Sequence, residues 1–270
     1  MEAVALEGGR PLEILRIEDL QMHFGGLRAL DGVSIEVAQG EIAAIIGPNG
    51  AGKTTVFNCI SKFYKPTGGR IFFRGRDITS LSPHQVSALG IARTFQNLEI
   101  FPGMTALENI LTGAHKTIRA GVFSGLLLGK NSREERKAKE RALDMLDFLG
   151  ISSAEEKIAS SLPYGFRKLL EIARALLSGP SILLLDEPAA GMNEREKAEV
   201  AKIILDIRDD LGVTVLLVEH DMNLVMQVAR RITVLDYGKV IAFGTPEEIR
   251  KNPRVIEAYL GAEEGQPDVQ

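Results

Sequence analysis

The residues best suited to chemistry begin directly after a short apolar run, Glu41–Ile46. There the chain reads GPNGAGKT, which matches the phosphate-binding pattern G-x-x-x-x-G-K-[ST]. Glycines in such a loop let backbone N–H groups converge on phosphate oxygens, and a following helix adds positive potential at its N-terminus. The residues expected to contact the phosphates are Gly47, Pro48, Asn49, Gly50, Ala51, Gly52, Lys53, Thr54 and Thr55.

Two side chains of this loop have specific expected roles. Lys53 is long enough to reach β- and γ-phosphates, and the hydroxyl of Thr54 is a typical Mg²⁺ ligand. A chance glycine turn before a helix is the alternative interpretation. The pattern needs a buried strand before the loop and a helix after it, and the sequence predicts both, which favours the phosphate site.

A second apolar run, Ile182–Leu185, ends in two carboxylates, Asp186 and Glu187. In phosphate-loop enzymes an acidic residue at such a strand end holds Mg²⁺ through water, which is the role expected of Asp186. Glu187 is expected to point away from Asp186 and to orient or deprotonate the attacking water. An acidic pair at a strand end is usually only a solvated terminus, but together with the loop at Gly47 it becomes a specific signal for this kind of site.

The composition describes an ordinary globular protein. Of 270 residues, 45% are hydrophobic and 25% charged, with a net charge of −4, which gives no support for nucleic-acid binding. The single cysteine, Cys59, lies in an apolar stretch and is expected to be buried. No apolar run approaches the roughly 18 residues that a membrane span requires, so any work at a membrane is expected from outside the bilayer.

The remaining elements follow from hydrophobic periodicity. Strands are expected at Leu12–Phe24, Val33–Val37, Arg70–Arg74 and Val213–Val218, with a closing hairpin at Ile232–Leu235 and Lys239–Phe243. Helices are expected from Thr54, at 132–150 and at Leu169–Leu177, and the segment between Leu81 and Ser160 reads as mostly helical. The pattern predicts an α/β core with an antiparallel β subdomain and an inserted helical subdomain.

Several further motifs follow one another in a recognisable order. They are Phe24 before Gly25-Gly26, Thr94-Phe95-Gln96, Leu162–Gly165, Ala190–Asn193 and Val218–Asp221. With these motifs the sequence resembles ABC-type ATPases from about Leu12 to Leu260. The resemblance implies a P-loop NTPase fold of the ABC type, ATP and Mg²⁺ as cofactors, and one ATPase domain at 12–260. Its helical subdomain is expected at roughly 97–178, between disordered tails at 1–11 and 261–270.

The same resemblance implies roles for three more residues. Gln96 would contact Mg²⁺ and the catalytic water while sensing the transmembrane partner, and His220 would sense the γ-phosphate. Phe24 would stack on adenine, although an aromatic residue at a strand end can also be a core residue. Ala190–Asn193 occupies the place of the dimer-contact loop.

The signature motif departs from the family pattern L-S-G-G-Q. The expected trans-acting residues are Leu162, Pro163, Tyr164 and Gly165, which would cap the γ-phosphate of ATP bound to the opposite subunit. Pro163, Tyr164 and Phe166 replace three of the five usual residues, so no serine hydroxyl can donate to that phosphate. The trans contact would then depend on the Gly165 amide and the N-terminus of the following helix.

Other features resemble one subgroup, the first ATPase of high-affinity branched-chain amino-acid importers. They are the tyrosine before Gly165, the stretch Pro188–Gly191, an insert at 113–132 and the ending from Gly244 to Gly261. Urea or amide import and lipopolysaccharide export are the alternatives. A soluble ABC protein outside transport is a weaker one, because the chain has one cassette and no heptad run.

The subgroup implies partners and a location. Transmembrane permease subunits and a second ATPase subunit are expected, the latter in a heterodimer, with a homodimer as the alternative for the isolated chain. A periplasmic binding protein would act indirectly, and no nucleic-acid partner is expected. The chain would be peripheral, at the cytoplasmic face of the inner (plasma) membrane.

Overall fold

A computed structural model of the chain describes residues 6–7, 10–94, 99–116 and 133–263. Its central sheet contains β5 (Ile42–Ile46), β8 (Ile91–Arg93), β9 (Ile182–Asp186), β10 (Thr214–Val218), β11 (Arg231–Asp236) and β12 (Lys239–Gly244). The strand order is β12-β11-β5-β10-β9-β8, and all neighbours run parallel except the hairpin of β11 and β12. This arrangement places the phosphate-loop strand, β5, inside the sheet.

The strands β5, β9 and β10 are apolar apart from Asp186 and Thr214, because both faces of the sheet are covered. In β5, Ile42, Ala44 and Ile46 belong to one hydrophobic cluster, whereas Ala43 and Ile45 belong to a second. β9 and β10 alternate between the same two clusters. An uninterrupted apolar run is therefore the sequence signal of each of these strands.

The second cluster joins the central sheet to an antiparallel one. That sheet contains β3 (Glu13–Phe24), β4 (Leu27–Ala38), β6 (Gly68–Phe73) and β7 (Arg76–Asp77), in the order β4-β3-β6-β7. Helix α1 (Lys53–Ile60) lies beside it and contributes Val56 and Phe57 to this cluster, together with the buried Cys59. Helix α2 (Pro83–Ala88) then leads into β8.

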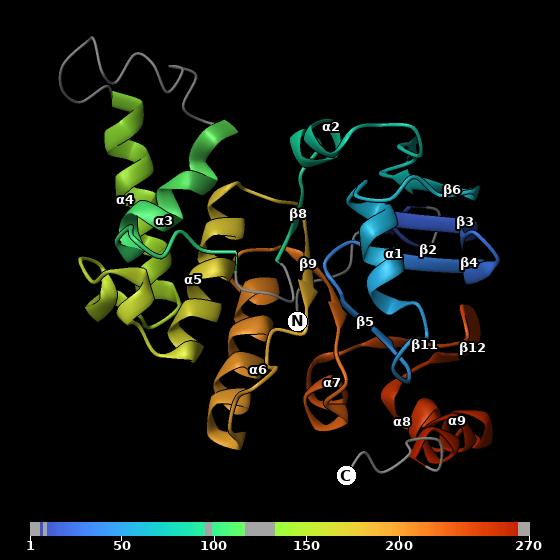
Figure 1. The fold of residues 1–270 in the computed structure, drawn as a ribbon. Helices are drawn as coiled ribbons and strands as arrows, with labels where there is room; N and C mark the ends of the chain where they lie inside the picture. The colour runs from blue at the N-terminus through green and yellow to red at the C-terminus, as the bar shows by residue number, and fades with distance from the viewer. Residues whose placement is uncertain (1–5, 8–9, 95–98, 117–132, 264–270) are drawn as a thin grey trace.

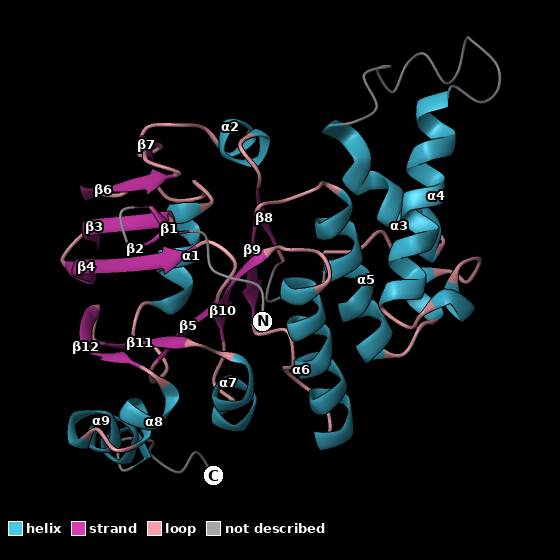
Figure 2. Ribbon diagram, turned by 180° about the vertical axis from the view of Figure 1, so that it is seen from behind, coloured by secondary structure: helices cyan, strands magenta, loops and turns pink. Residues whose placement is uncertain are grey.

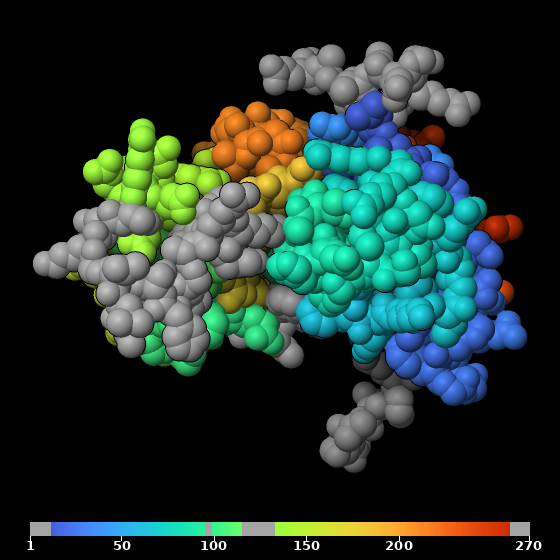
Figure 3. Space-filling model, turned by 90° about the horizontal axis from the view of Figure 1, so that it is seen from above, coloured from blue at the N-terminus to red at the C-terminus, as the bar shows by residue number. Residues whose placement is uncertain are grey.

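The helical part of the chain lies on the opposite side of the central sheet (Figures 1 and 2). It consists of α3 (Ala106–Leu111), α4 (Arg133–Phe148), α5 (Tyr164–Leu177) and the 3₁₀ turns η1 (Thr112–Lys116), η2 (Ser152–Ala154) and η3 (Ala159–Ser161). Seen from above, the yellow-green surface of α4 and the blue and cyan surface of the antiparallel sheet stand at opposite ends of the molecule (Figure 3).

Four more helices complete the described chain. They are α6 (Glu194–Asp209), α7 (Met222–Val228), α8 (Pro246–Arg250) and α9 (Pro253–Glu263). Ile249 of α8 and Val255 of α9 are buried in the first cluster, which ties the C-terminal helices to the central sheet. Among the described helices, none combines the length and the hydropathy needed to span a bilayer.

The structure departs from the sequence predictions in two elements. Ile91–Arg93 forms β8 within a segment predicted to be mostly helical, because three residues are too few to show a strand period. Helix α5 begins at Tyr164 rather than Leu169, since Gly165 and Phe166 interrupt the apolar periodicity of its first turn.

The ends of the chain also contain regular structure. Within 1–11, predicted as a disordered tail, Leu6–Glu7 (β1) pairs with Arg10–Pro11 (β2). At the other end α9 continues to Glu263. The limits of the ATPase domain, 12–260, and of its helical subdomain, roughly 97–178, stay predictions.

Candidate active site

Three loops meet at one edge of the central sheet. β5, β10 and β9 are neighbours and run parallel, so their carboxyl ends lie side by side. β5 ends at the Gly47 loop, β9 at Asp186 and Glu187, and β10 before Glu219 and His220. The carboxyl edge of a parallel sheet is where open α/β folds bind ligands.

The phosphate loop needs glycine at two positions for steric reasons. Gly47 has φ 152°, and a Cβ there would lie 2.1 Å from the carbonyl oxygen of Leu235 in β11. Gly52 has φ 102°, and its Cβ would lie 2.7 Å from the carbonyl oxygen of Ala29 in β4. The loop packs against β11 at Gly47 and against β4 at Gly52, and this packing excludes a side chain at both positions.

Lys53 is the first residue of α1 and is only 7% exposed. Its Nζ donates hydrogen bonds to the carbonyl oxygens of Gly47, at 2.7 Å, and Pro48, at 2.9 Å. Burial lowers the pKa of Lys53, and the nearby carboxylates of Glu187 and Asp186 oppose that change. The loop thus holds a cation close to both acidic residues, and Thr54 and Thr55 follow in the first helical turn.

Asp186 is buried at the end of β9, with 1% of its surface exposed. Its Oδ2 accepts a hydrogen bond from Arg93 Nη2 at 2.8 Å, and its backbone N–H donates to Thr94 Oγ1 at 3.2 Å. Burial raises the pKa of Asp186, and the Arg93 guanidinium opposes the increase. Oδ1 is also buried and accepts no hydrogen bond from the described residues.

That oxygen bears on whether the site fits a metal ion. A buried carboxylate oxygen without a donor is rare unless an ion or water completes it. Mg²⁺ at phosphate sites is held by one or two protein oxygens and the phosphates. Asp186 Oδ1 and the Thr54 hydroxyl at the start of α1 are oxygen ligands of this kind, so the residues present fit Mg²⁺.

Glu187 and His220 are brought together from neighbouring strands. Glu187 has φ 47°, in the left-handed region, and its N–H donates to the carbonyl oxygen of Val218 at 2.9 Å. His220 Nδ1 lies 3.9 Å from Glu187 Oε2, and the histidine side chain is 58% exposed. The expected water-activating carboxylate and the expected phosphate sensor therefore share one open edge of the site.

Glu219 is a residue whose importance the sequence does not reveal beyond its place in Val218–Asp221. It is fully buried, and its Oε1 accepts the Ala189 N–H at 3.0 Å. Its Oε2 accepts the N–H groups of His220, at 2.9 Å, and Asp221, at 3.3 Å. One carboxylate thus ties the turn after Glu187 to the turn that carries His220.

Lys168 is another buried charge that sequence periodicity does not indicate. It lies on α5, is 2% exposed, and belongs to the helix that starts at the signature motif. Burial lowers the pKa of Lys168, while Glu171 on the same helix and Asp186 oppose that change. The helical part of the chain therefore brings a cation toward the carboxylates of the site.

Phe24 ends β3 and is 42% exposed, so it is not a core residue. Its ring meets the ring of Tyr64 edge to face, with centroids 5.2 Å apart and an interplanar angle of 77°. Tyr64 follows α1 and has no sequence feature that marks it for this role. The pair leaves aromatic surface open to solvent beside the phosphate loop's helix, where a base could stack.

The signature residues lie at the start of α5. Leu162 is buried, and Pro163 directly precedes the helix without a side-chain cap. A Cβ at Gly165 would be 3.4 Å from Glu196 Oε1, and one at Gly191 would be 3.4 Å from the Tyr164 ring. The motif thus contacts α6 and the predicted dimer-contact loop of its own chain. Gln96 lies outside the described residues.

Comparisons with known proteins decide the family. A model of the ABC transporter family matches residues 30–190. The chain belongs to the ABC transporter family of ATPases. A second family model, described as branched-chain amino acid ATP-binding cassette transporter, matches residues 239–265 of this ABC ATPase. These matches confirm the predicted family and the predicted fold. They also confirm nucleotide binding as an activity of this family.

Individual relatives agree over nearly the whole chain. The "High-affinity branched-chain amino acid transport ATP-binding protein LivG" of Salmonella typhimurium is 47% identical over 249 residues, which is 92% of this chain and 98% of that protein. The ADP conformation of MJ1267, an ATP-binding cassette of an ABC transporter, has a TM-score of 0.81 and 35% identity, covering 92% and 99% of the two chains. The dimeric bacterial cassette MJ0796 has a TM-score of 0.74 and 26% identity, covering 86% and 99%.

Proposed function

We propose that this ABC ATPase hydrolyses ATP with Mg²⁺ to drive the import of branched-chain amino acids through separate permease subunits. The observation that carries the chemistry is the meeting of Lys53, Asp186, Glu187 and His220 at one edge of the sheet. The substrate is supported by the likeness to LivG along 98% of that protein and by the family model matched at residues 239–265.

Each residue of the site has a task in this reaction. Phe24 stacks on adenine, and the loop 47–55 holds the phosphates through the backbone N–H groups of its residues other than Pro48. Lys53 exchanges its bonds with the Gly47 and Pro48 carbonyls for the β- and γ-phosphates, which offer more negative charge. Thr54, Gln96 and, through water, Asp186 would hold Mg²⁺, which would supply positive charge to neutralise the phosphates.

The catalytic residues act on the water and the γ-phosphate. Glu187 accepts the proton of the attacking water, and its left-handed backbone directs the side chain from the strand end toward His220. His220 donates a hydrogen bond to the γ-phosphate, stabilising charge that grows in the transition state. Glu219 touches no substrate; it positions the two turns that carry these groups.

Hydrolysis requires a second ATPase subunit. Leu162, Pro163, Tyr164 and Gly165 of one subunit cap ATP bound to the other, with the Gly165 amide and the α5 N-terminus facing the γ-phosphate. A heterodimer with a second ATPase is the proposed assembly, and a homodimer is the alternative for the isolated chain. The dimeric MJ0796 cassette supports a paired arrangement.

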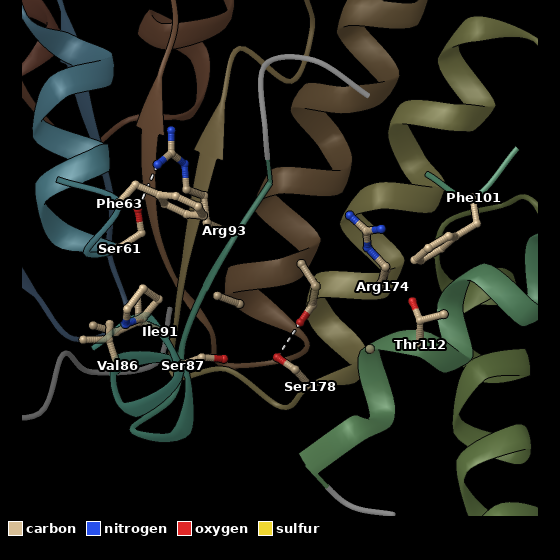
Figure 4. Close-up of a pocket in the computed structure, with 14 residues that line it drawn as sticks. Ser61, Phe63, Val86, Ser87, Ile91, Arg93, Phe101, Thr112, Arg174 and Ser178 are labelled. Atoms are coloured by element: carbon tan, nitrogen blue, oxygen red, sulfur yellow. Dashed lines mark hydrogen bonds between the residues drawn. The ribbon is translucent and has the colours of Figure 1, made fainter. Parts of the chain in front are cut away.

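A permease segment is proposed to dock in a cleft of about 430 Å³ between the sheet and the helical part (Figure 4). Val86 and Arg93 line one side, and Phe101 and Arg174 line the other. Apolar walls with two arginines suit an amphipathic segment with acidic or carbonyl groups.

Uptake measurements test the proposal. Cells that lack the gene should regain uptake of labelled leucine with the wild-type chain but not with Glu187→Gln. The purified variant should keep its ATP affinity while hydrolysis slows about 10²–10⁴-fold, because an amide cannot accept the water's proton. Normal leucine uptake without the chain, with loss of labelled urea or acetamide uptake, would reassign the substrate. Wild-type turnover by Glu187→Gln would remove Glu187 from the mechanism.

A further inference from the structure

Arg93, at the end of β8, connects two parts of the ATPase site. Its side chain is 7% exposed and Nη2 donates to Asp186 Oδ2 at 2.8 Å. Nη1 donates to Asn58 Oδ1 at 2.7 Å and to Ser61 Oγ at 2.8 Å. Asn58 lies in α1, the helix that begins at the phosphate loop, and Ser61 directly follows it. One guanidinium therefore joins the end of that helix to the carboxylate proposed to hold Mg²⁺.

The same guanidinium also reaches the cleft between the sheet and the helical part. Arg93 lines this cleft together with Phe63, and its Cζ lies 5.8 Å from the centre of the Phe63 ring (Figure 4). The centre of the Phe57 ring, which is buried in the core, lies 5.5 Å from the same Cζ atom. Phe63 is 56% exposed, so a segment in the cleft can pack on a ring that Arg93 itself contacts.

Because Arg93 and Asp186 are both buried, displacement of one side chain affects the stability of the other. Two charges this deeply buried are stable only while paired, so neither side chain can leave its position without a cost to the other. The pair uses Asp186 Oδ2, and Oδ1 accepts no hydrogen bond from the described residues. The position of Arg93 thus decides which carboxylate oxygen is left for a cation.

We infer that Arg93 is a positioning residue through which a permease segment seated in the cleft acts on Asp186. This inference rests on the proposed function, because it takes Asp186 as the Mg²⁺ carboxylate and the cleft as the permease site. A segment that packs on Phe63 or offers Arg93 an acceptor changes how firmly Arg93 holds Oδ2. Coupling is reciprocal, so a cation beside Asp186 must also change the surroundings of Arg93 at the cleft.

This reciprocity allows a test on the chain alone. The sequence contains no tryptophan, so Phe63→Trp introduces a single indole next to the Arg93 guanidinium. The background is Glu187→Gln, which prevents turnover, with ATP saturating and Mg²⁺ added last. The expected result is a change of indole emission on Mg²⁺ addition. Asp186→Asn should abolish the change, since the emission reports the hold of Arg93 on that carboxylate.

Variants in the cleft separate positioning from simple packing. Arg93→Lys keeps a positive charge beside Asp186 but loses the fork that bonds Asn58 and Asp186 together, so it should fold and respond less. Arg174→Gln is the matched control. Arg174 lines the same cleft and donates to the carbonyl oxygen of Glu99, so the emission change should persist in this variant.

Calorimetry of ATP binding with Mg²⁺, measured for every variant, distinguishes failure of the proposed function from failure of the role inferred for Arg93. Absence of nucleotide binding by the parent would overturn the proposed function itself. Normal binding with no emission change in the parent would overturn only the role of Arg93. A full change in Arg93→Lys, or its loss in Arg174→Gln, would likewise show that the indole reports movement of the whole cleft and would refute the inference.

Discussion

Glu219→Gln should destabilise the protein much more than the same substitution at Glu187. The change replaces one carboxylate oxygen with an amide group of almost the same size, so packing is preserved. Glu219 is fully buried and uses both oxygens, one for the N–H of Ala189 and the other for those of His220 and Asp221. Whichever oxygen becomes the amide nitrogen, at least one backbone donor then faces another donor.

The magnitude follows from those contacts. A buried donor left without an acceptor costs about 1–3 kcal/mol, and the new amide N–H adds a second unsatisfied group. We therefore expect a loss of about 2–4 kcal/mol in the free energy of unfolding. For a domain of this size, such a loss lowers Tm by roughly 5–15 °C.

Thermal unfolding followed by circular dichroism, without nucleotide, measures the effect. Glu187→Gln is the matched control, because Glu187 has 18% of its side chain exposed and water can replace lost bonds there. The control should unfold near the wild-type temperature and lose hydrolysis, whereas Glu219→Gln should unfold well below it. Equal Tm values for the two variants would refute the structural role assigned to Glu219.

Three further predictions concern the nucleotide site and the dimer. Lys53→Ala should weaken ATP binding about 10–100-fold, as measured with a fluorescent analogue, because a charged hydrogen-bond donor to phosphate is lost; unchanged affinity would make the loop purely structural. Gly165→Asp should leave ATP binding by the monomer intact but abolish ATP-driven dimerisation, as measured by sedimentation. The new Cβ would lie 3.4 Å from Glu196 Oε1, and the new carboxylate would repel the γ-phosphate of ATP bound to the opposite subunit. Formation of an ATP-bound dimer by this variant would contradict the prediction. Tyr64→Ala should lower ATP affinity about 2–10-fold by freeing the Phe24 ring. Tripolyphosphate affinity should not change, and equal losses for both ligands would exclude the aromatic pair from the base site.

The sequence predicts the strands and the loop at the carboxyl edge of the central sheet well, because their signals are local. β5, β9 and β10 are apolar on both faces, and each therefore reads as an unbroken hydrophobic run. Gly47 and Gly52 of the phosphate loop are required by steric contacts with β11 and β4, so at these two positions the motif and its geometry coincide. The order of strand, loop and helix is enough to place Lys53 and Asp186.

Contacts between distant segments leave no such signal. Arg93 and Asp186 are 93 positions apart, and nothing in the residues around either one announces the other. The acceptor role of Glu219 and the pairing of Phe24 with Tyr64 also arise only when separate elements pack. β8 is too short to show a strand period, and it becomes a strand because β9 offers a hydrogen-bonding edge.

The position of β5 inside the central sheet determines how late during synthesis on the ribosome this part of the sheet can form. Its two neighbours are β10 and β11, so the phosphate loop emerges long before the strands that hold its own strand in place. At roughly 5–20 residues per second, synthesis from β5 to β11 takes on the order of 10–40 s. During that interval both edges of an apolar strand await partners, which is the stage most open to chaperones and to aggregation. Gly47 packs against Leu235 of β11, so the phosphate loop reaches the position in which ATP can stabilise it only after β11 has been made.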